Sequence, residues 1–163
     1  MTNKYSAIMC RSSNYVVGIQ NKLPWYYSYE LKLFREITKR YKHVLMGYNT
    51  YKSIPNGLKD RICHVATNNI RAHGTTSKYA RYPVHFTAEI PTGLSKGIII
   101  GGPKTITKCA NLIDKLYLSI IHEEYEGDSF FNEQDIFNLN LIKSKEYLNF
   151  THKEYECTNK TNT

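Results

Sequence analysis

The sequence lacks the patterns that mark several large classes of protein. Its four cysteines, at positions 10, 63, 109 and 157, lie far apart and form neither a C-x-x-C pair nor a matching histidine spacing, as a structural zinc site would require. No apolar run approaches the length of a membrane span, and the N-terminus lacks the charged-then-apolar pattern of a signal peptide. We therefore expect no metal site, no membrane contact, and a cytoplasmic protein with reduced thiols.

Acidic residues are scarcer than basic ones, since 14 Asp and Glu against 22 Lys and Arg give a formal net charge of +8. Such a balance favours an acidic ligand, an anionic surface or a nucleic acid as partner. The basic residues are scattered singly rather than gathered in one run or on one helix face, which argues against a nucleic acid. Small anionic ligands fit the charge equally well, and a nucleic-acid binder is the alternative.

The 163 residues suit one domain, and 41% of them are hydrophobic. Buried-strand patterns are predicted at residues 5–11, 43–46, 62–67, 84–86, 97–100 and 114–125. Helical patterns are predicted at residues 28–41, 50–54 and 103–110. Strands that alternate with helices favour a mostly parallel sheet with right-handed crossovers, and a hairpin predicted from residues 142–147 and 151–157 adds an antiparallel edge.

One stretch combines the only tryptophan, Trp25, with the helical pattern over residues 28–41. Ser28 is the predicted N-cap, and Glu30 lies four residues before Phe34, on the same face of the helix. If that face is buried, the carboxylate loses solvation and its pKa rises. If it faces water, Glu30 is a first-turn acid that complements the helix dipole. The spacing alone fits both interpretations.

Two glycine turns follow predicted strands and open predicted helices, as phosphate-binding turns do. Gly47 precedes Thr50, which is predicted to cap a helix and to donate its hydroxyl, while Gly101 and Gly102 precede Lys104. Neither turn matches G-x-G-x-x-G or the P-loop pattern, and each alone is also what an ordinary turn looks like. Two in one small domain indicate an extended ligand that carries a polyphosphate.

Arg61 follows an Asn56-Gly57 turn and lies three residues after Leu58. An arginine beside apolar residues can clamp a carboxylate through two parallel hydrogen bonds, which a lysine cannot do. The alternative is a solvated surface arginine. The six histidines are isolated from any Ser, Cys or Asp arrangement, so none is assigned a catalytic role.

Leu23-Pro24-Trp25, followed by the acid at position 30, resembles the dihydrofolate reductase family. The resemblance continues at Phe34 and Thr38, through residues 44–54, at Leu58 and Arg61, and then at residues 100–102, 116–118 and 126–131, in the order and at the spacing of the family. It implies a single domain over residues 1–163, with an adenosine-binding subdomain at 42–92. The implied fold is an eight-stranded mixed, mostly parallel sheet with an antiparallel C-terminal edge strand and flanking helices.

The resemblance also implies an activity, the NADPH-dependent reduction of 7,8-dihydrofolate to 5,6,7,8-tetrahydrofolate in one-carbon metabolism, and hence an antifolate target. In that family Glu30 would accept hydrogen bonds from the pterin and promote protonation of N5, with Trp25 beside the water that delivers the proton. The partners implied are small molecules bound by a monomer.

The family's binding positions carry over residue by residue onto this sequence. The substrate-binding positions match Ile8, Glu30, Leu31, Phe34, Ile54, Leu58, Arg61, Ile100 and Ser119. The cofactor-binding positions match Cys10, Val17, Gly18, Ile19, Leu23, Gly47, Asn49, Thr50, Thr67, Asn68, Gly101, Gly102, Lys104 and Thr105. Arg61 would bind the glutamate α-carboxylate, and Asp128 would hold the mobile loop over residues 16–23 closed by bonding to its backbone.

Several positions depart from the family pattern. Tyr48 and Asn68 stand where a basic residue and a serine usually contact the adenosine 2′-phosphate, a task that Arg71 or another nearby cation could take over. Ile106 replaces a tyrosine that commonly lies near the nicotinamide, and Pro103 removes one amide donor after the glycine pair. These departures motivate an alternative hypothesis, a non-catalytic protein of the family fold kept for binding or structure.

Overall fold

A computed structural model describes residues 3–69, 76–77 and 80–160, so Arg71 lies outside the described residues. The strands are β1 (Tyr5–Ser12), β2 (Val16–Gly18), β3 (His43–Gly47), β4 (Ile62–Ala66), β5 (Val84–Thr87), β6 (Gly97–Ile99), β7 (Ile113–Ile121), β8 (Ser129–Phe130), β9 (Phe137–Glu146) and β10 (Phe150–Asn159). The helices are α1 (Ser28–Thr38), α2 (Tyr48–Tyr51), α4 (Pro103–Lys108), the 3-10 turn η1 (Ala110–Leu112) and α5 (Glu133–Ile136).

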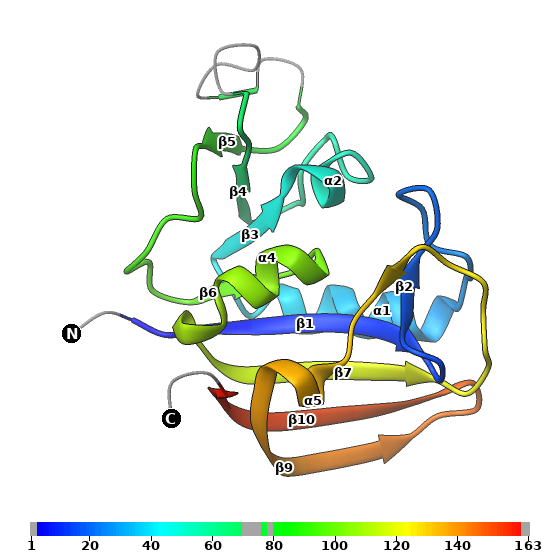
Figure 1. Cartoon of the computed structure of the whole chain (residues 1–163). Coiled ribbons are helices and arrows are strands. Elements are labelled where there is room, and N and C mark those ends of the chain that lie inside the picture. The colour runs from blue at the N-terminus through cyan, green and yellow to red at the C-terminus, as the bar shows by residue number, and fades with distance from the viewer. Residues whose placement is uncertain (1–2, 70–75, 78–79, 161–163) are drawn as a thin grey trace.

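Eight of the strands form one twisted sheet in the order β5-β4-β3-β6-β1-β7-β10-β9 (Figure 1). The strands from β5 to β7 pair in parallel, whereas β10 pairs antiparallel with both β7 and β9. The predicted mixed, mostly parallel sheet with an antiparallel C-terminal edge is confirmed. β2 and β8 form a separate two-stranded sheet that the sequence patterns did not predict.

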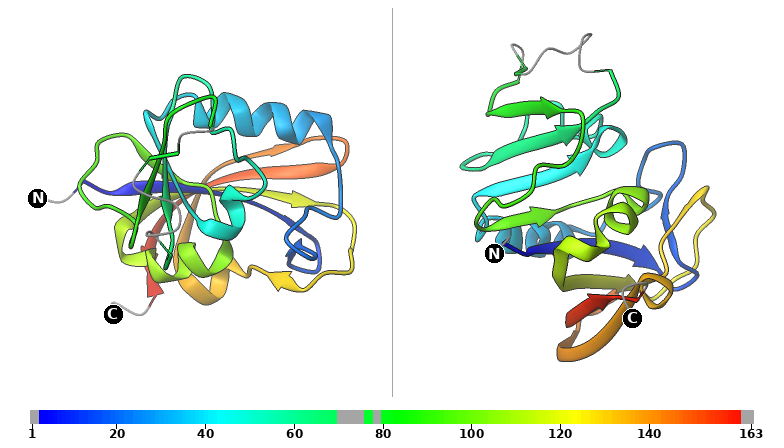
Figure 2. Two further views of the ribbon diagram at one scale, coloured as in Figure 1. Left: turned by 90° about the horizontal axis from the view of Figure 1, so that it is seen from above. Right: turned by 60° about the vertical axis from the view of Figure 1, so that its left-hand side comes forward.

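Helices cover both faces of the sheet, with α1 on one side and α4 and α5 on the other (Figure 2). Successive residues of a strand point to opposite faces, so Ile8 of β1 belongs to the core cluster that contains Ile37 of α1. Its neighbours Ala7 and Met9 belong to the cluster that contains Ile106 of α4. β1 is therefore buried on both faces, which explains its nearly continuous apolar run.

Several predicted boundaries were wrong at the ends of helices. Tyr27, not Ser28, is the N-cap of α1, because its backbone is extended while Ser28 is already helical, and no side chain caps this end. The helix ends at Thr38 rather than at residue 41. α2 begins at Tyr48 directly after Gly47, so Thr50 lies inside the helix and does not cap it.

Two strand boundaries also differ from the prediction. β7 ends at Ile121 instead of continuing to residue 125, because the chain turns at His122, whose N–H donates to the carbonyl of Asn149 at the hairpin turn. β9 begins at Phe137, five residues before the predicted start, and is exposed along most of its length. That exposure explains why its apolar pattern was weak.

Candidate active site

Glu30 lies in the first turn of α1 and is only 7% exposed. The side chains of Cys10 and Ser119 are polar groups that face its carboxyl group. Burial raises the pKa of Glu30 to about 7, because the charged form loses solvation, and these two groups oppose this rise as potential hydrogen-bond donors to the carboxylate. The interpretation as a water-facing first-turn acid is therefore wrong, and the buried one is confirmed.

The sheet register explains why Cys10 and Ser119 meet Glu30 together. The two residues are direct partners in the parallel pairing of β1 with β7, and so they present their side chains on the same face. α1 covers this face, and its first turn brings the carboxylate to them. The same burial raises the pKa of the Cys10 thiol well above its ordinary value, and the neighbouring Glu30 carboxyl adds to the rise.

Apolar side chains surround the carboxylate. Ile8 and Ile100 are buried, and Phe34, Ile54 and Leu58 are half-buried against the core cluster that holds both of them. Leu31, also half-buried, lies on α1 next to Glu30. These six predicted substrate residues come from four separate segments of the chain, and five of them, all but Leu31, belong to or pack against one core cluster.

Trp25 is buried beside Tyr125, with ring centroids 5.1 Å apart. Its Nε1–H group has no acceptor at hydrogen-bonding geometry among the described residues, although its proximity to Cys10 counters part of the rise in the pKa of that thiol. A buried N–H without a partner is rare in proteins. Trp25 therefore offers a hydrogen-bond donor near Cys10, the residue that also faces Glu30.

Arg61 is buried, with only 6% of its surface exposed, and is not the solvated arginine of the alternative interpretation. Its Nη1 donates to Thr38 Oγ1 at 2.6 Å, and its Nε donates to the carbonyl of Lys59 at 2.9 Å. No acidic side chain in the described part of the chain forms an ion pair with it. Burial lowers the pKa of Arg61, and a fixed, largely desolvated guanidinium is a strong binder of a carboxylate.

The two glycine turns meet at the ends of the neighbouring strands β3 and β6. The N–H of Gly47 donates to the carbonyl of Gly101 at 2.9 Å, and the Gly101–Gly102 peptide bond is cis. A Cβ on Gly47 would lie 2.5 Å from Thr105 Oγ1, and one on Gly101, whose φ is +135°, would lie 3.2 Å from Thr50 Oγ1. A side chain at Gly47 would displace the Thr105 hydroxyl, and one at Gly101 would be strained by the positive φ, so both threonine hydroxyls lie close to glycine backbone.

The remaining predicted cofactor residues lie around these turns or on the loop after β1. Thr67 is buried, and its N–H donates to the carbonyl of Thr87. Asn49, Asn68, Lys104 and Leu23 are exposed, Ile19 is half-buried, and Val17 and Gly18 are buried in β2. Of the departures, Ile106 is fully buried in the core and Tyr48 lies against Tyr51, with Lys52 Nζ 5.6 Å from the Tyr48 ring centre.

The loop after β1 is fastened by β8. The Gly18 carbonyl accepts from the N–H of Asp128 at 3.0 Å, and the N–H of Gln20 donates to Asp128 Oδ2 at 3.0 Å. The predicted contact of Asp128 with the loop backbone is therefore present. The antiparallel pairing of β2 with β8 was not predicted, because Val16–Gly18 is too short to show an alternating pattern.

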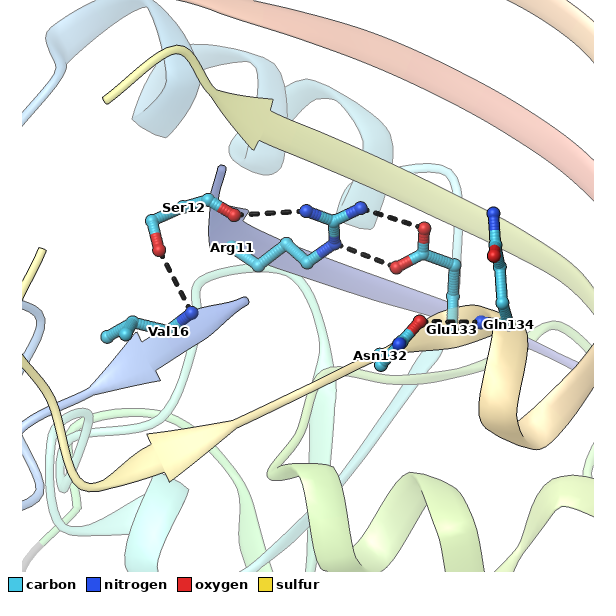
Figure 3. A network of polar contacts seen from close by, with 6 residues as sticks. All are labelled: Arg11, Ser12, Val16, Asn132, Glu133 and Gln134. Atoms are coloured by element: carbon cyan, nitrogen blue, oxygen red, sulfur yellow. Dashed lines mark hydrogen bonds and ion pairs between the residues drawn. The ribbon is translucent and has the colours of Figure 1, made fainter. Parts of the chain in front are cut away.

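A buried ion pair anchors the same region from the other side of β1 (Figure 3). Arg11 Nε and Nη2 donate to the two carboxylate oxygens of Glu133 at 2.7 and 2.9 Å, and Arg11 Nη1 donates to the Ser12 carbonyl at 3.0 Å. Ser12 Oγ in turn accepts from the N–H of Val16 at the start of β2. The pair ties the start of α5 to the end of β1, where the fastened loop begins, and sequence reasoning missed it.

The described part of the chain places no three His, Cys, Asp or Glu side chains so that they could hold a metal ion. None of the helices in the described ranges has the length and hydrophobicity needed to cross a membrane. The fold and the site together define an α/β protein with one buried acid and, at the ends of β3 and β6, a pair of glycine turns.

Comparison with known proteins identifies the family. The family model described as "Dihydrofolate reductase" matches residues 4–162. A dihydrofolate reductase of Bacillus subtilis is 32% identical over 143 residues, which cover 86% of this chain and 83% of that protein. One of Haemophilus influenzae is 32% identical over 129 residues, covering 78% of each chain.

A solved structure gives the same answer for the fold. The "Dihydrofolate reductase from Enterococcus faecalis complexed with NADP(H)" and a second ligand superimposes with a TM-score of 0.70 at 21% identity, covering 96% of this chain and 99% of that one. The chain belongs to the dihydrofolate reductase family. Membership confirms the predicted fold and the predicted class of enzyme, an NADPH-dependent dihydrofolate reductase.

Proposed function

We propose that this chain reduces 7,8-dihydrofolate to 5,6,7,8-tetrahydrofolate, and that Glu30 orients the pterin ring for the reaction. The observation that carries the proposal is the buried Glu30 carboxyl group, which faces Cys10 and Ser119 at the covered surface of the sheet. In a desolvated slot, one polar group that binds a ring edge is enough to fix the orientation of the ring. When bound, NADPH supplies the hydride that passes to C6 of the pterin.

Glu30 acts as an orienting group rather than as the proton donor. Its carboxylate accepts hydrogen bonds from the pterin 2-amino group and from ring N3, and its negative charge favours protonation at N5. The proton reaches N5 through a water, which the unpartnered Nε1–H of Trp25 is placed to hold. A pKa of about 7 for Glu30 means that its charge changes within the physiological pH range.

The other predicted substrate residues fit a ligand that is flat at one end and anionic at the other. Phe34 and Ile54 sandwich the aminobenzoyl ring, with Leu31 and Leu58 beside them. Arg61 binds the glutamate α-carboxylate, since its guanidinium is buried and forms no ion pair with an acidic side chain of the described ranges. Ile8 and Ile100 offer backbone carbonyls to the pterin edge, and Ser119 supports Glu30.

The paired glycine turns support a dinucleotide site, because each lies beside a threonine hydroxyl, Thr105 at Gly47 and Thr50 at Gly101, that could bind a phosphate together with the backbone. We assign the pyrophosphate to the residues of these turns: Gly47, Asn49, Thr50, Gly101, Gly102, Lys104 and Thr105. Cys10, Val17, Gly18, Ile19 and Leu23 border the nicotinamide ribose, and Thr67 and Asn68 border the adenosine ribose. Lys52, adjacent to Tyr48, is the cation within the described residues that we assign to the 2′-phosphate.

We further propose that residues 1–163 act as one domain in which residues 42–92 form the adenosine-binding subdomain, because that segment contributes β3, α2, β4 and β5 as one edge of the sheet. The expectations of a monomeric and cytoplasmic protein stay predictions. Size-exclusion chromatography and cell fractionation test them.

The deciding experiment mixes the purified protein with dihydrofolate and either NADPH or NADH, and follows loss of the reduced nicotinamide absorbance. We expect turnover with NADPH and slower turnover with NADH. Binding of both ligands without turnover would favour the non-catalytic alternative and overturn the proposal. Equal rates with both cofactors would keep the reductase but refute the assignment of Lys52.

The role of Glu30 is tested by Glu30→Gln, which keeps the shape and removes the charge. The rate of hydride transfer should fall on the order of 100-fold at pH 7 and recover in part at lower pH, where N5 protonates unaided. Glu36→Gln, an exposed acid on the same helix, is the matched control and should retain the full rate. A rate that Glu30→Gln leaves unchanged at every pH would exclude the role.

A further inference from the structure

His152 of β10 lies beside Ser119 of β7, which faces the Glu30 carboxyl group. It is the register partner of Ser119 in the antiparallel pairing of β10 with β7, and its Nδ1 lies 3.1 Å from Ser119 Oγ. His152 is 6% exposed, and its Nε2 is buried without a hydrogen-bond partner among the described residues. β7 and β10 run side by side in the sheet (Figure 1), and Ser119 and His152 are both buried there.

The unpartnered Nε2 decides which nitrogen of His152 carries the proton. In neutral imidazole one nitrogen is a donor and the other an acceptor. A proton on Nε2 would leave a buried N–H without an acceptor, which costs more than leaving a lone pair without a donor. The proton therefore sits on Nδ1, where it is donated to Ser119 Oγ.

That donation fixes the direction of the next hydrogen bond. Ser119 has one hydroxyl proton, and its oxygen already accepts from His152, so the proton is free to be donated to Glu30. The hydrogen bonds then run in one sense from His152 through Ser119 to Glu30, and bonds linked in this way polarise and strengthen one another.

We propose that His152 is a positioning residue for Glu30, which acts by donating from Nδ1 to Ser119 and so directs the Ser119 hydroxyl proton to the Glu30 carboxylate. The effect of this contact on the reaction rests on the proposed function, whereas its effect on the pKa of Glu30 does not. A donor aimed at the carboxylate stabilises the charged form more than the neutral one, and so opposes the effect of burial on Glu30.

The surroundings of His152 keep its ring neutral, as this role requires. Burial lowers the pKa of His152, and among the nearby charges Glu154 opposes this while Lys143 and Arg40 add to it. The Tyr117 ring stacks on His152 at 6.2 Å between centroids, and Lys145 is the register partner on β9. At the other end of the proposed chain of hydrogen bonds, the side chains that face the Glu30 carboxyl group are Cys10 and Ser119.

The test titrates the ligand-free protein, labelled with carbon-13 at glutamate side-chain carboxyls and followed by NMR, with the Glu30 signal assigned by its loss in Glu30→Gln. In His152→Phe the pKa of Glu30 should rise by about 0.5, because Ser119 loses the bond that fixes and polarises it. His152→Asn, whose amide can replace the Nδ1 donor, should restore the original value. His122→Phe, which removes a histidine that bonds Thr151, is the matched control and should change nothing.

Ser119→Ala distinguishes an effect of His152 that passes through Ser119, here called the relay, from a direct effect of His152 on Glu30. It should raise the pKa of Glu30 by itself, and in that background neither His152→Phe nor His152→Asn should move it further. An unchanged Glu30 pKa in His152→Phe, or an equal shift with and without Ser119, would overturn the proposal. These titrations need no turnover, so a protein that failed to oxidise NADPH would refute the proposed function without deciding the relay.

Should the protein be active, the pH profile of single-turnover hydride transfer gives a second readout. The apparent pKa of the profile should move upward in His152→Phe by the amount found by NMR. At pH values below that pKa, where less of Glu30 is then charged, the rate should fall up to about 3-fold relative to the wild type at the same pH, as a shift of 0.5 requires, and well above it the two rates should be equal. A loss of rate that is the same at every pH would indicate a merely structural role and would overturn the assignment.

Discussion

Replacing Glu30 by glutamine should stabilise the ligand-free protein, and by an amount that depends on pH. Glu30 has an ordinary pKa of 4.5 in the unfolded chain and one of about 7 in the fold, because burial disfavours its charge. Below pH 4.5 the group is protonated in both states and has no effect on stability. Above pH 7 it is charged in both states, and the folded state carries the full cost of a desolvated charge.

The size of the effect follows from the difference between the two pKa values. Between pH 4.5 and 7 the folded state binds more protons than the unfolded one, so the free energy of unfolding falls as the pH rises. A difference of roughly 2.5 between the two pKa values, at about 1.4 kcal/mol per unit, gives a loss of at most about 3.5 kcal/mol. Glutamine has no charge to desolvate and can still accept a hydrogen bond from Ser119, so it avoids most of this loss.

The assay is urea unfolding of the wild type and of Glu30→Gln at pH 5 and at pH 8. Since all other groups titrate alike in both proteins, the difference between the two unfolding free energies isolates Glu30. We expect the variant to be more stable by about 1–3 kcal/mol at pH 8 and by much less at pH 5. Glu36→Gln, an exposed acid on α1, should show no such pH-dependent difference.

Two results would refute the reasoning. A difference between wild type and Glu30→Gln that is the same at both pH values would mean that Glu30 does not titrate within this range in the fold. A variant that is less stable at pH 8 would mean that the hydrogen bonds of Glu30 outweigh its desolvation. Either result would also remove the physical basis for a charge that changes near neutral pH.

Three further changes test the rest of the site. Arg61→Lys should raise the KM for dihydrofolate about 10-fold with little change in kcat, since lysine cannot form the bidentate contact, and a collapse of kcat at constant KM would contradict the assignment. Gly47→Ala would place a Cβ 2.5 Å from Thr105 Oγ1 and should weaken NADPH binding about 10-fold. Fluorescence titration measures the Kd, and an unchanged Kd would show that this turn does not hold the cofactor. Arg11→Met should lower the free energy of unfolding by about 3–5 kcal/mol, because it leaves the Glu133 carboxylate buried and unpaired. Adding Glu133→Leu should regain much of the lost stability. A double variant as unstable as Arg11→Met would argue against the unpaired carboxylate as the cause.

The order and direction of the main strands were predictable because local signals agreed with one another. Buried runs such as His43–Gly47 and Gly97–Ile99 end at or beside glycine, and the segments between them carry helical or turn patterns. The neighbourhood of Glu30 was predictable only in part. The helical spacing placed it on a face with Phe34, but whether that face was buried depended on the packing of α1 against the sheet.

Contacts between distant segments escaped prediction for a different reason. Arg11 stands inside an apolar strand, which signals that it has a partner, but nothing local identifies Glu133 at a separation of 122 residues. His152 faces Ser119 only in the observed register of β10 on β7. A slip of one residue would turn its side chain to the other face of the sheet, so the role of His152 is invisible until the register is known.

The end of β1 connects the buried acid Glu30 on one face of the sheet with the Arg11–Glu133 ion pair on the other. Cys10 and Arg11 are adjacent and therefore point to opposite faces of the sheet. Cys10 contacts the Glu30 carboxyl on the face covered by α1, while Arg11 fastens α5 through Glu133 on the other. The contact with a destabilising buried acid and the ion pair beside the start of the loop are thus fixed by one rigid strand. Arg11→Met should consequently disturb the closure of the loop as well as the free energy of unfolding, and hydrogen exchange at the N–H of Gln20, which is bonded to Asp128, should report it.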